Sequence, residues 1–198
     1  MIRPNFAMDA PPTSIDVGGV SYPVDVDFRT WIDVTGMMRG FYAEADTPER
    51  QLHNAELLEQ MEERVFGGIL ADEHPDDVLR GIIAFSRGYP TSLPGGGESG
   101  PALFSFEHDI NWIIIAIRNQ SGIDLSYRRT EPFHWWEFIL EFQTLCGDHY
   151  ILNLMEARGY RGDDADMRKR RAACALPVEH TADEQAALEA LNDMFYGA

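Results

Sequence analysis

The chain has 198 residues and a formal net charge of −17, with 33 acidic against 16 basic side chains. This length fits one domain and allows a full apolar core without disulfide staples. The acidic balance excludes bulk attraction to nucleic acid or to an anionic membrane, and it favours a well-solvated protein.

The cysteine content and the apolar runs indicate a reducing compartment and no membrane segment. Cys146 and Cys174 are the only cysteines and lack CxxC spacing, which is typical of a reduced cytoplasmic protein. The first residues have no apolar signal region, and the longest apolar run, Trp112 to Ile117, is far shorter than the roughly 20 residues of a membrane span. We therefore expect a soluble, unprocessed protein.

The amino-terminal half predicts a β-hairpin followed by helices. Residues 1–13 are proline-rich and form an expected flexible arm. Two β-branched runs, 14–17 and 20–26, flank Gly18-Gly19, which predicts a hairpin with a two-residue turn. Helical periodicity, a Thr-Pro-Glu start and glycine stops then predict three helices, at 27–42, 47–66 and 75–87.

An aromatic-rich stretch dominates the second half, after an expected flexible loop at 89–101. Its first pattern is a helix at 106–121 with one apolar face, formed by Phe106, Ile110, Ile113, Ile114 and Ile117. Trp112 and Ile115 point elsewhere. Either this helix is buried on both sides, or its second apolar strip meets a partner.

The second aromatic pattern predicts a nearly enclosed helix that Thr130 caps. A narrow polar stripe is all that interrupts its apolar surface, and its members are His134, Glu137, Glu141 and Thr144. We expect an aromatic core centred on Trp31, Ile113, Ile117, Trp136 and Phe138. The predicted fold is mainly α-helical, a single multi-helix domain with a short amino-terminal β-hairpin.

The carboxyl-terminal region predicts two further helices and an acidic amphipathic one. Residues 150–157 continue a helical pattern, and acids at 163–166 precede the bases of 168–171, as suits a helix dipole. Thr181 and Glu184 form a capping box, and an apolar face follows at Leu188, Leu191 and Phe195. This helix either docks on its own domain or is held out for a partner. The expected organisation is an arm (1–13), a helical domain (14–177) and a terminal helix (178–198).

No catalytic, cofactor-binding or metal-binding constellation is complete, so we expect no enzyme. Gly95, Gly97 and Gly100 match GxGxxG, but prolines bound the run, which favours a loop. His134 with Glu137 and Glu141 could hold one metal ion from a single helix face, and this leaves a metal-dependent enzyme as an alternative. The six bases between Arg158 and Arg171 could contact phosphate or an acidic protein, although a self-neutralising surface is favoured.

Several short motifs, taken in order, resemble a known family. They are FxxD at Phe106 to Asp109, GIDL at Gly122 to Leu125, HWWxF at His134 to Phe138, and a basic helix ending in ALP at Pro177. The run from Tyr22 to Trp31 is similar to the family's opening. With this order, the chain resembles the bacteriophage family named for gene product fifteen over most of its length.

The resemblance implies a non-catalytic tail assembly chaperone of long-tailed phages in the host cell cytoplasm. Such a protein would bind the tape-measure protein until the major tail protein displaces it, and no nucleic acid, membrane or cofactor would be involved. Self-association is left open. Candidate partner-binding residues are Trp112, Ile115, Leu188, Leu191 and Phe195. A structural tail subunit retained in the virion is a further alternative.

Overall fold

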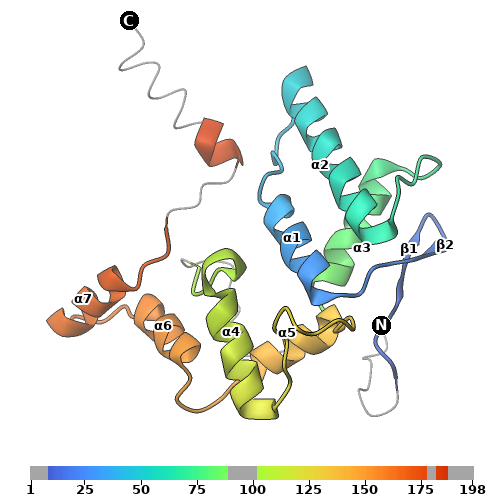
Figure 1. Cartoon of the computed structure of the whole chain (residues 1–198). Coiled ribbons are helices and arrows are strands. Elements are labelled where there is room, and N and C mark those ends of the chain that lie inside the picture. Colours follow the sequence, from blue (N-terminus) through green and yellow to red (C-terminus); the bar gives the residue numbers. More distant parts are fainter. Residues whose placement is uncertain (1–8, 89–101, 178–181, 187–198) are drawn as a thin grey trace, which may run out of the picture. The chain divides into compact units, whose positions relative to one another are not determined.

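The structure of the chain is a computed structural model that describes residues 9–88, 102–177 and 182–186 (Figure 1). These residues contain a β-hairpin and the helices α1 to α7, and residues 182–186 are helical as well. The mainly α-helical fold with an amino-terminal hairpin is confirmed. The described residues divide into two compact units. The hairpin unit comprises residues 12–87 and 182–186, and the aromatic unit comprises residues 9–11, 88 and 102–177.

The hairpin unit begins with two short antiparallel strands. β1 (Ser14–Val17) pairs with β2 (Val20–Pro23), and Val17 lies opposite Val20. Gly18 and Gly19 form the turn with φ values of 58° and 90°, a conformation that glycine adopts without steric cost. The predicted hairpin is therefore confirmed.

Three helices complete this unit, and their ends follow local capping rules. α1 (Phe28–Met38) begins after Asp27, and α2 (Pro48–Phe66) runs from its cap Thr47 to the left-handed Gly67. α3 spans Pro75–Ser86. α1 ends four residues before the predicted boundary. The amide of Tyr42 instead donates to Asn54 Oδ1 at 2.9 Å, and its carbonyl accepts from Asn54 Nδ2 at 3.0 Å.

Trp31 is the central side chain of the hairpin unit. It is fully buried and stacks on Phe85, with ring centroids 4.5 Å apart. Its Nε1 donates to the carbonyl of Asp25 at 2.7 Å, and the amide of Asp25 donates to the carbonyl of Val65 at 2.7 Å. Trp31 thus connects α1 to α3 by stacking on Phe85. It also connects α1 to the end of α2, because Asp25 hydrogen-bonds both Trp31 and Val65. Other buried apolar side chains of this unit are Ile15, Val17, Phe28, Val34, Leu58, Met61, Val65, Val78 and Ile82.

A buried acid, Glu62, lies on the inner side of α2. Its Oε2 accepts a hydrogen bond of 2.9 Å from the amide of Leu70, which holds the loop that follows the helix. Burial raises the pKa of this carboxyl, while the hydrogen bond from Leu70 acts in the opposite direction.

The aromatic unit contains four helices. α4 (Phe106–Ser121) packs against α5 (Trp135–Gln143) and α6 (Tyr150–Gly159), and α7 (Ala165–Ala173) packs against α6 (Figure 1). Buried apolar side chains from α4, α5, α6 and the connecting loops form one core: Ile113, Ala116, Ile117, Leu125, Phe133, Trp135, Phe138, Phe142, Leu145, Ile151, Leu154 and Ala157. Three of the predicted core members here, Ile113, Ile117 and Phe138, are fully buried.

α5 differs from the prediction in its start and in its packing. The predicted cap, Thr130, was wrong, because Nδ1 of His134 accepts the amide of Trp136 at 3.0 Å and the helix begins at Trp135. Its buried side chains lie on one face, and the others as far as Glu141 are half-buried. Trp135, Phe138 and Phe142 face inward at i, i+3 and i+7, and Trp135 is 1% exposed. Trp136 is half-buried, so its placement in the core was wrong.

The first prediction compares two helical glycines. A Cβ built on Gly81 of α3 would lie 2.6 Å from Cγ2 of the buried Ile15, whereas a Cβ on Gly36 of α1 meets nothing within 4 Å. We expect Gly81→Ala to destabilise the hairpin unit by about 1–3 kcal/mol, because β1 must move away from α3. Gly36→Ala should stabilise it by about 0.4–1 kcal/mol through the unfolded chain. Chemical denaturation of both variants measures this, and equal effects would contradict the close β1–α3 packing.

Candidate functional site

A buried ion pair joins the two central helices of the aromatic unit. Asp109 of α4 and Arg158 of α6 are 2% and 8% exposed. Arg158 Nη1 lies 2.6 Å from Asp109 Oδ2, and Nη2 lies 3.1 Å from Oδ1, so the pair is bidentate. Two parallel charge-assisted bonds fix both the distance and the orientation between the helices.

Backbone groups satisfy most of the remaining capacity of this pair. Arg158 Nε donates to the carbonyl of Cys174 at 2.7 Å, and Nη1 also donates to the carbonyl of Leu103 at 3.0 Å. Asp109 Oδ2 accepts the amide of Ser105 at 3.0 Å. The pair therefore connects α4, α6, the segment before α4 and the end of α7. The sequence analysis had counted Arg158 among the six bases of a surface ending at Arg171. This was wrong for Arg158, because its guanidinium is buried.

The same two helices present an exposed apolar strip. Trp112 and Ile115 of α4 are 43% and 38% exposed, and Tyr150 at the start of α6 is 56% exposed. The rings of Trp112 and Tyr150 contact each other, with centroids 4.6 Å apart. The sequence left open whether α4 is buried on both sides or has a second apolar strip for a partner. Burial on both sides is wrong, because Trp112 and Ile115 are exposed. We call Trp112, Ile115 and Tyr150 the apolar strip.

The motif residues of the second half have structural tasks. In FxxD, the ring of Phe106 packs on the ring of Phe138, and Asp109 forms the ion pair with Arg158. In GIDL, Gly122 ends α4 with a φ of 76° and Leu125 is buried. In HWWxF, His134 caps α5, and the first Trp and the Phe are buried. These residues build the scaffold, so a functional surface has to be sought among exposed side chains.

The polar stripe of α5 is not assembled as a metal site. His134 lies at the helix start and uses Nδ1 as a backbone cap, while Glu137 and Glu141 are half-buried further along. Within the described ranges, no three His, Cys, Asp or Glu side chains are gathered so as to hold a metal ion. Cys146 is exposed and Cys174 is half-buried, and neither forms a disulfide.

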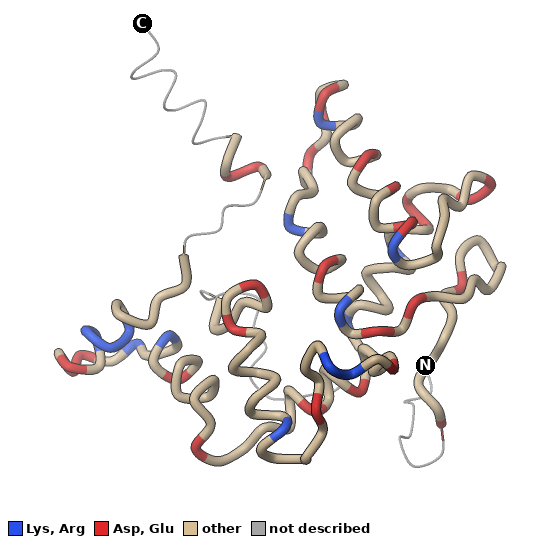
Figure 2. Tube along the Cα trace, in the orientation of Figure 1, with Lys and Arg blue, Asp and Glu red and all other residues tan. Residues whose placement is uncertain are grey.

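The basic run lies on α7, which follows its sequence prediction. Asp164 caps this helix by accepting the amide of Met167 at 2.8 Å, and the bases follow towards its end (Figure 2). No residue of α7 is buried. Acids at the start and bases at the end suit the helix dipole without any ligand.

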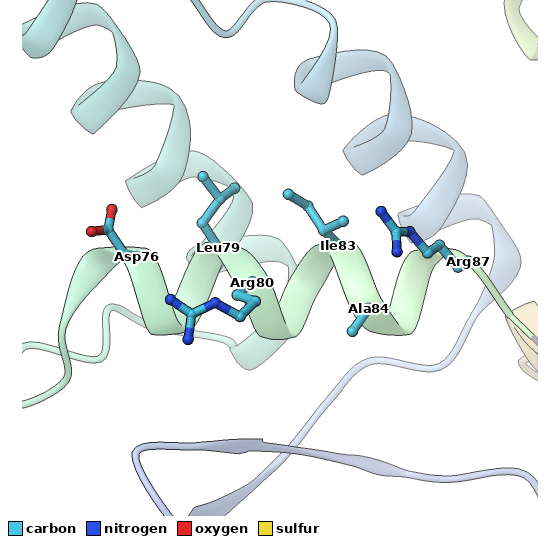
Figure 3. A pocket seen from close by; sticks show the side chains of 6 residues that line it. All are labelled: Asp76, Leu79, Arg80, Ile83, Ala84 and Arg87. Carbon is cyan, nitrogen blue, oxygen red and sulfur yellow. The ribbon is translucent and has the colours of Figure 1, made fainter. Parts of the chain in front are cut away.

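An apolar groove in the hairpin unit was not foreseen from the sequence. Its volume is about 550 Å³, and it lies between the chain after α1, one face of α2, and α3. The apolar side chains among its lining are Met38, Phe41, Tyr42, Ala43, Ala45, Ala55, Leu58, Pro75, Leu79 and Ile83. Figure 3 shows Leu79 and Ile83 projecting from the same side of α3, where they also border a smaller hollow with Arg80 and Arg87.

Some predicted features lie outside the described residues. Among these are three candidate partner-binding residues, Leu188, Leu191 and Phe195, and the glycine run at 95–100. In the part of the chain that the structure describes, no helix has both the length and the apolar character needed to cross a bilayer.

Comparison with known proteins identifies one family. Residues 8–175 match the family described as bacteriophage Gp15 protein. The chain belongs to this family, and it is a bacteriophage protein. No curated protein and no solved structure matches it significantly.

The second prediction concerns the buried ion pair. Asp109→Asn removes the charge that faces Arg158 and leaves a guanidinium buried without its counterion, which typically costs about 3–5 kcal/mol. The control is Asp33→Asn in the hairpin unit, since Asp33 and Arg64 form an exposed pair at 2.6 Å. Loss of an exposed pair costs at most about 1 kcal/mol. Thermal unfolding monitored by circular dichroism should separate the two variants clearly, and similar losses would refute a structural role for Asp109.

Proposed function

We propose that the protein is a tail assembly chaperone that binds the tape-measure protein in the host cytoplasm and does not catalyse a reaction. Family membership supports a phage role, and the family resemblance implies this particular one. The observation that carries the proposal is the apolar strip, because two large aromatic side chains and an isoleucine stay exposed on rigid helices. Such a strip is typical of a surface that meets another protein.

The position of the strip suits a client that is long and helical. Trp112 and Ile115 are three residues apart on α4, and Tyr150 extends the strip onto α6. The buried ion pair holds these helices together. A client helix with an apolar face can pack along such a row without a deep pocket.

The expected strength of binding fits a shield that is later removed. Full burial of one large apolar side chain contributes roughly 1.5–3 kcal/mol, and these three side chains are already about half covered. The strip therefore offers roughly 2–4 kcal/mol per site, a binding energy that competing contacts can overcome. The major tail protein could then displace the chaperone during tube growth, with no nucleotide consumed.

The net charge supports the same assignment. An acidic protein with a charge of −17 stays soluble while it exposes apolar side chains. The strip is bordered by exposed polar side chains on α4, namely Asn111, Arg118 and Asn119. Such a border limits self-aggregation through the strip.

The third prediction tests the apolar strip directly. We expect the double variant Trp112→Ala, Ile115→Ser to fold normally, because both side chains are exposed. After co-expression it should capture about tenfold less tape-measure protein, because loss of a central apolar contact typically weakens binding by about that factor. Affinity purification of the tagged chaperone, with quantification of the client, measures this.

A matched control is Leu52→Ser, which removes an apolar side chain that is 61% exposed on α2 in the other unit. Its capture of the client should equal that of the unchanged protein. If the strip variant also captured the client fully, the strip would not be the binding surface. If the unchanged protein captured none, the chaperone proposal itself would fail.

A further inference from the structure

The apolar groove of the hairpin unit is a candidate binding surface. Its walls include Phe41, Leu58, Leu79 and Ile83, and its volume of about 550 Å³ would hold several large side chains. Leu58 is buried, while the other three are only half-buried. An apolar hollow of this size in an otherwise acidic protein is typical of a surface that binds an apolar group.

The carboxyl-terminal part of the chain is anchored at the rim of this groove. Asp183, in the helical stretch 182–186, accepts the amide of Ala43 at 2.9 Å. Its other carboxylate oxygen lies 3.7 Å from Nη1 of Arg50. Ala43 lines the groove, and Arg50 lies one residue before Gln51, which also lines it. The described stretch therefore ends, at residue 186, three residues after this contact at the edge of the groove.

The sequence of residues 187–198 suits such a groove. At helical spacing, Leu188, Leu191 and Phe195 fall on one face at i, i+3 and i+7. Twelve helical residues span about 18 Å, and Leu188 follows Asp183 by only about 7.5 Å along a helix. The first anchor is thus within reach of the groove from the Asp183 contact.

One charge contact at the rim favours the same occupant. The segment from 182 to 198 contains four acids and no Lys or Arg: Asp183, Glu184, Glu189 and Asp193. The first of these, Asp183, lies 3.7 Å from Arg50. The α3 side of the groove carries charges of both signs, with Asp76 as well as Arg80 and Arg87 near Leu79 and Ile83 (Figure 3). The preference for an acidic segment over a basic one therefore comes from Arg50.

We infer that residues 187–198 occupy the groove of their own chain, with Leu188, Leu191 and Phe195 inserted between α2 and α3. The segment covers apolar side chains that would otherwise be exposed, and any partner that uses the groove has to displace it. This inference does not depend on the proposed function, because it concerns a surface in the other unit.

The experiment is photo-cross-linking in the full chain. Phe195→p-benzoylphenylalanine places a photoreactive group on the inserted face, and mass spectrometry after irradiation locates the cross-link. We expect cross-links to residues 38–45 or 79–83 within a product of monomer size. Asp193→p-benzoylphenylalanine is the matched control, since position 193 lies about 160° away on a helix and should give little of this product.

A second variant tests the groove itself. Ile83→Asp, combined with the probe at position 195, places a carboxylate on the apolar wall and should lower the cross-linked fraction on the order of tenfold. Circular dichroism checks that the helices are retained. The location of the cross-link in the parent chain tests the inference even if this variant unfolds.

Several outcomes would overturn the inference. A cross-linked product of dimer size would show that a second copy supplies the segment. Cross-links to the aromatic unit, no cross-link at all, or equal yields from positions 193 and 195 would show that the segment does not occupy the groove.

Discussion

The aromatic unit depends on the bidentate pair between Asp109 and Arg158. Both charges are buried, and desolvation makes this costly unless every polar atom is matched. The structure supplies the match from the carbonyls of Leu103 and Cys174 and the amide of Ser105. The net stabilisation from such a pair is small, but its geometry is demanding. It determines how α4 and α6 lie together, and the apolar strip spans these two helices.

The two units use different physical means to hold their helices. The hairpin unit has an apolar core around Trp31, and glycine at position 81 lets β1 approach α3 closely. The aromatic unit combines stacked rings with one buried ion pair. In both, the residues that look most distinctive in the sequence serve packing and capping. Of the apolar strip, the sequence had singled out Trp112 and Ile115 but not Tyr150.

Local signals predicted the elements well, and long-range packing escaped them. Gly18-Gly19, Thr47 and Gly122 act through their own backbone conformations, so the hairpin and helix ends followed from the sequence. The sequence placed Trp136 in the core, whereas Trp135 is the buried residue. The reason is that α5 carries apolar residues on several faces, and its contact with α4 determines which face is buried. Arg158 was expected on the surface, where most arginines lie, and its partner is 49 residues away. The groove combines three separate segments, and no local pattern encodes that.

In the function proposed here, this phage protein shields the tape-measure protein temporarily. The most direct measurement starts from the purified complex of the two proteins, to which the major tail protein is added so that tubes assemble. After the tubes are pelleted, the amount of this chain in pellet and supernatant is quantified by mass spectrometry. We expect the tape-measure protein to enter the tubes while this chain is released into the supernatant. Stoichiometric retention of the chain in the tubes would contradict it and would identify a structural tail subunit instead.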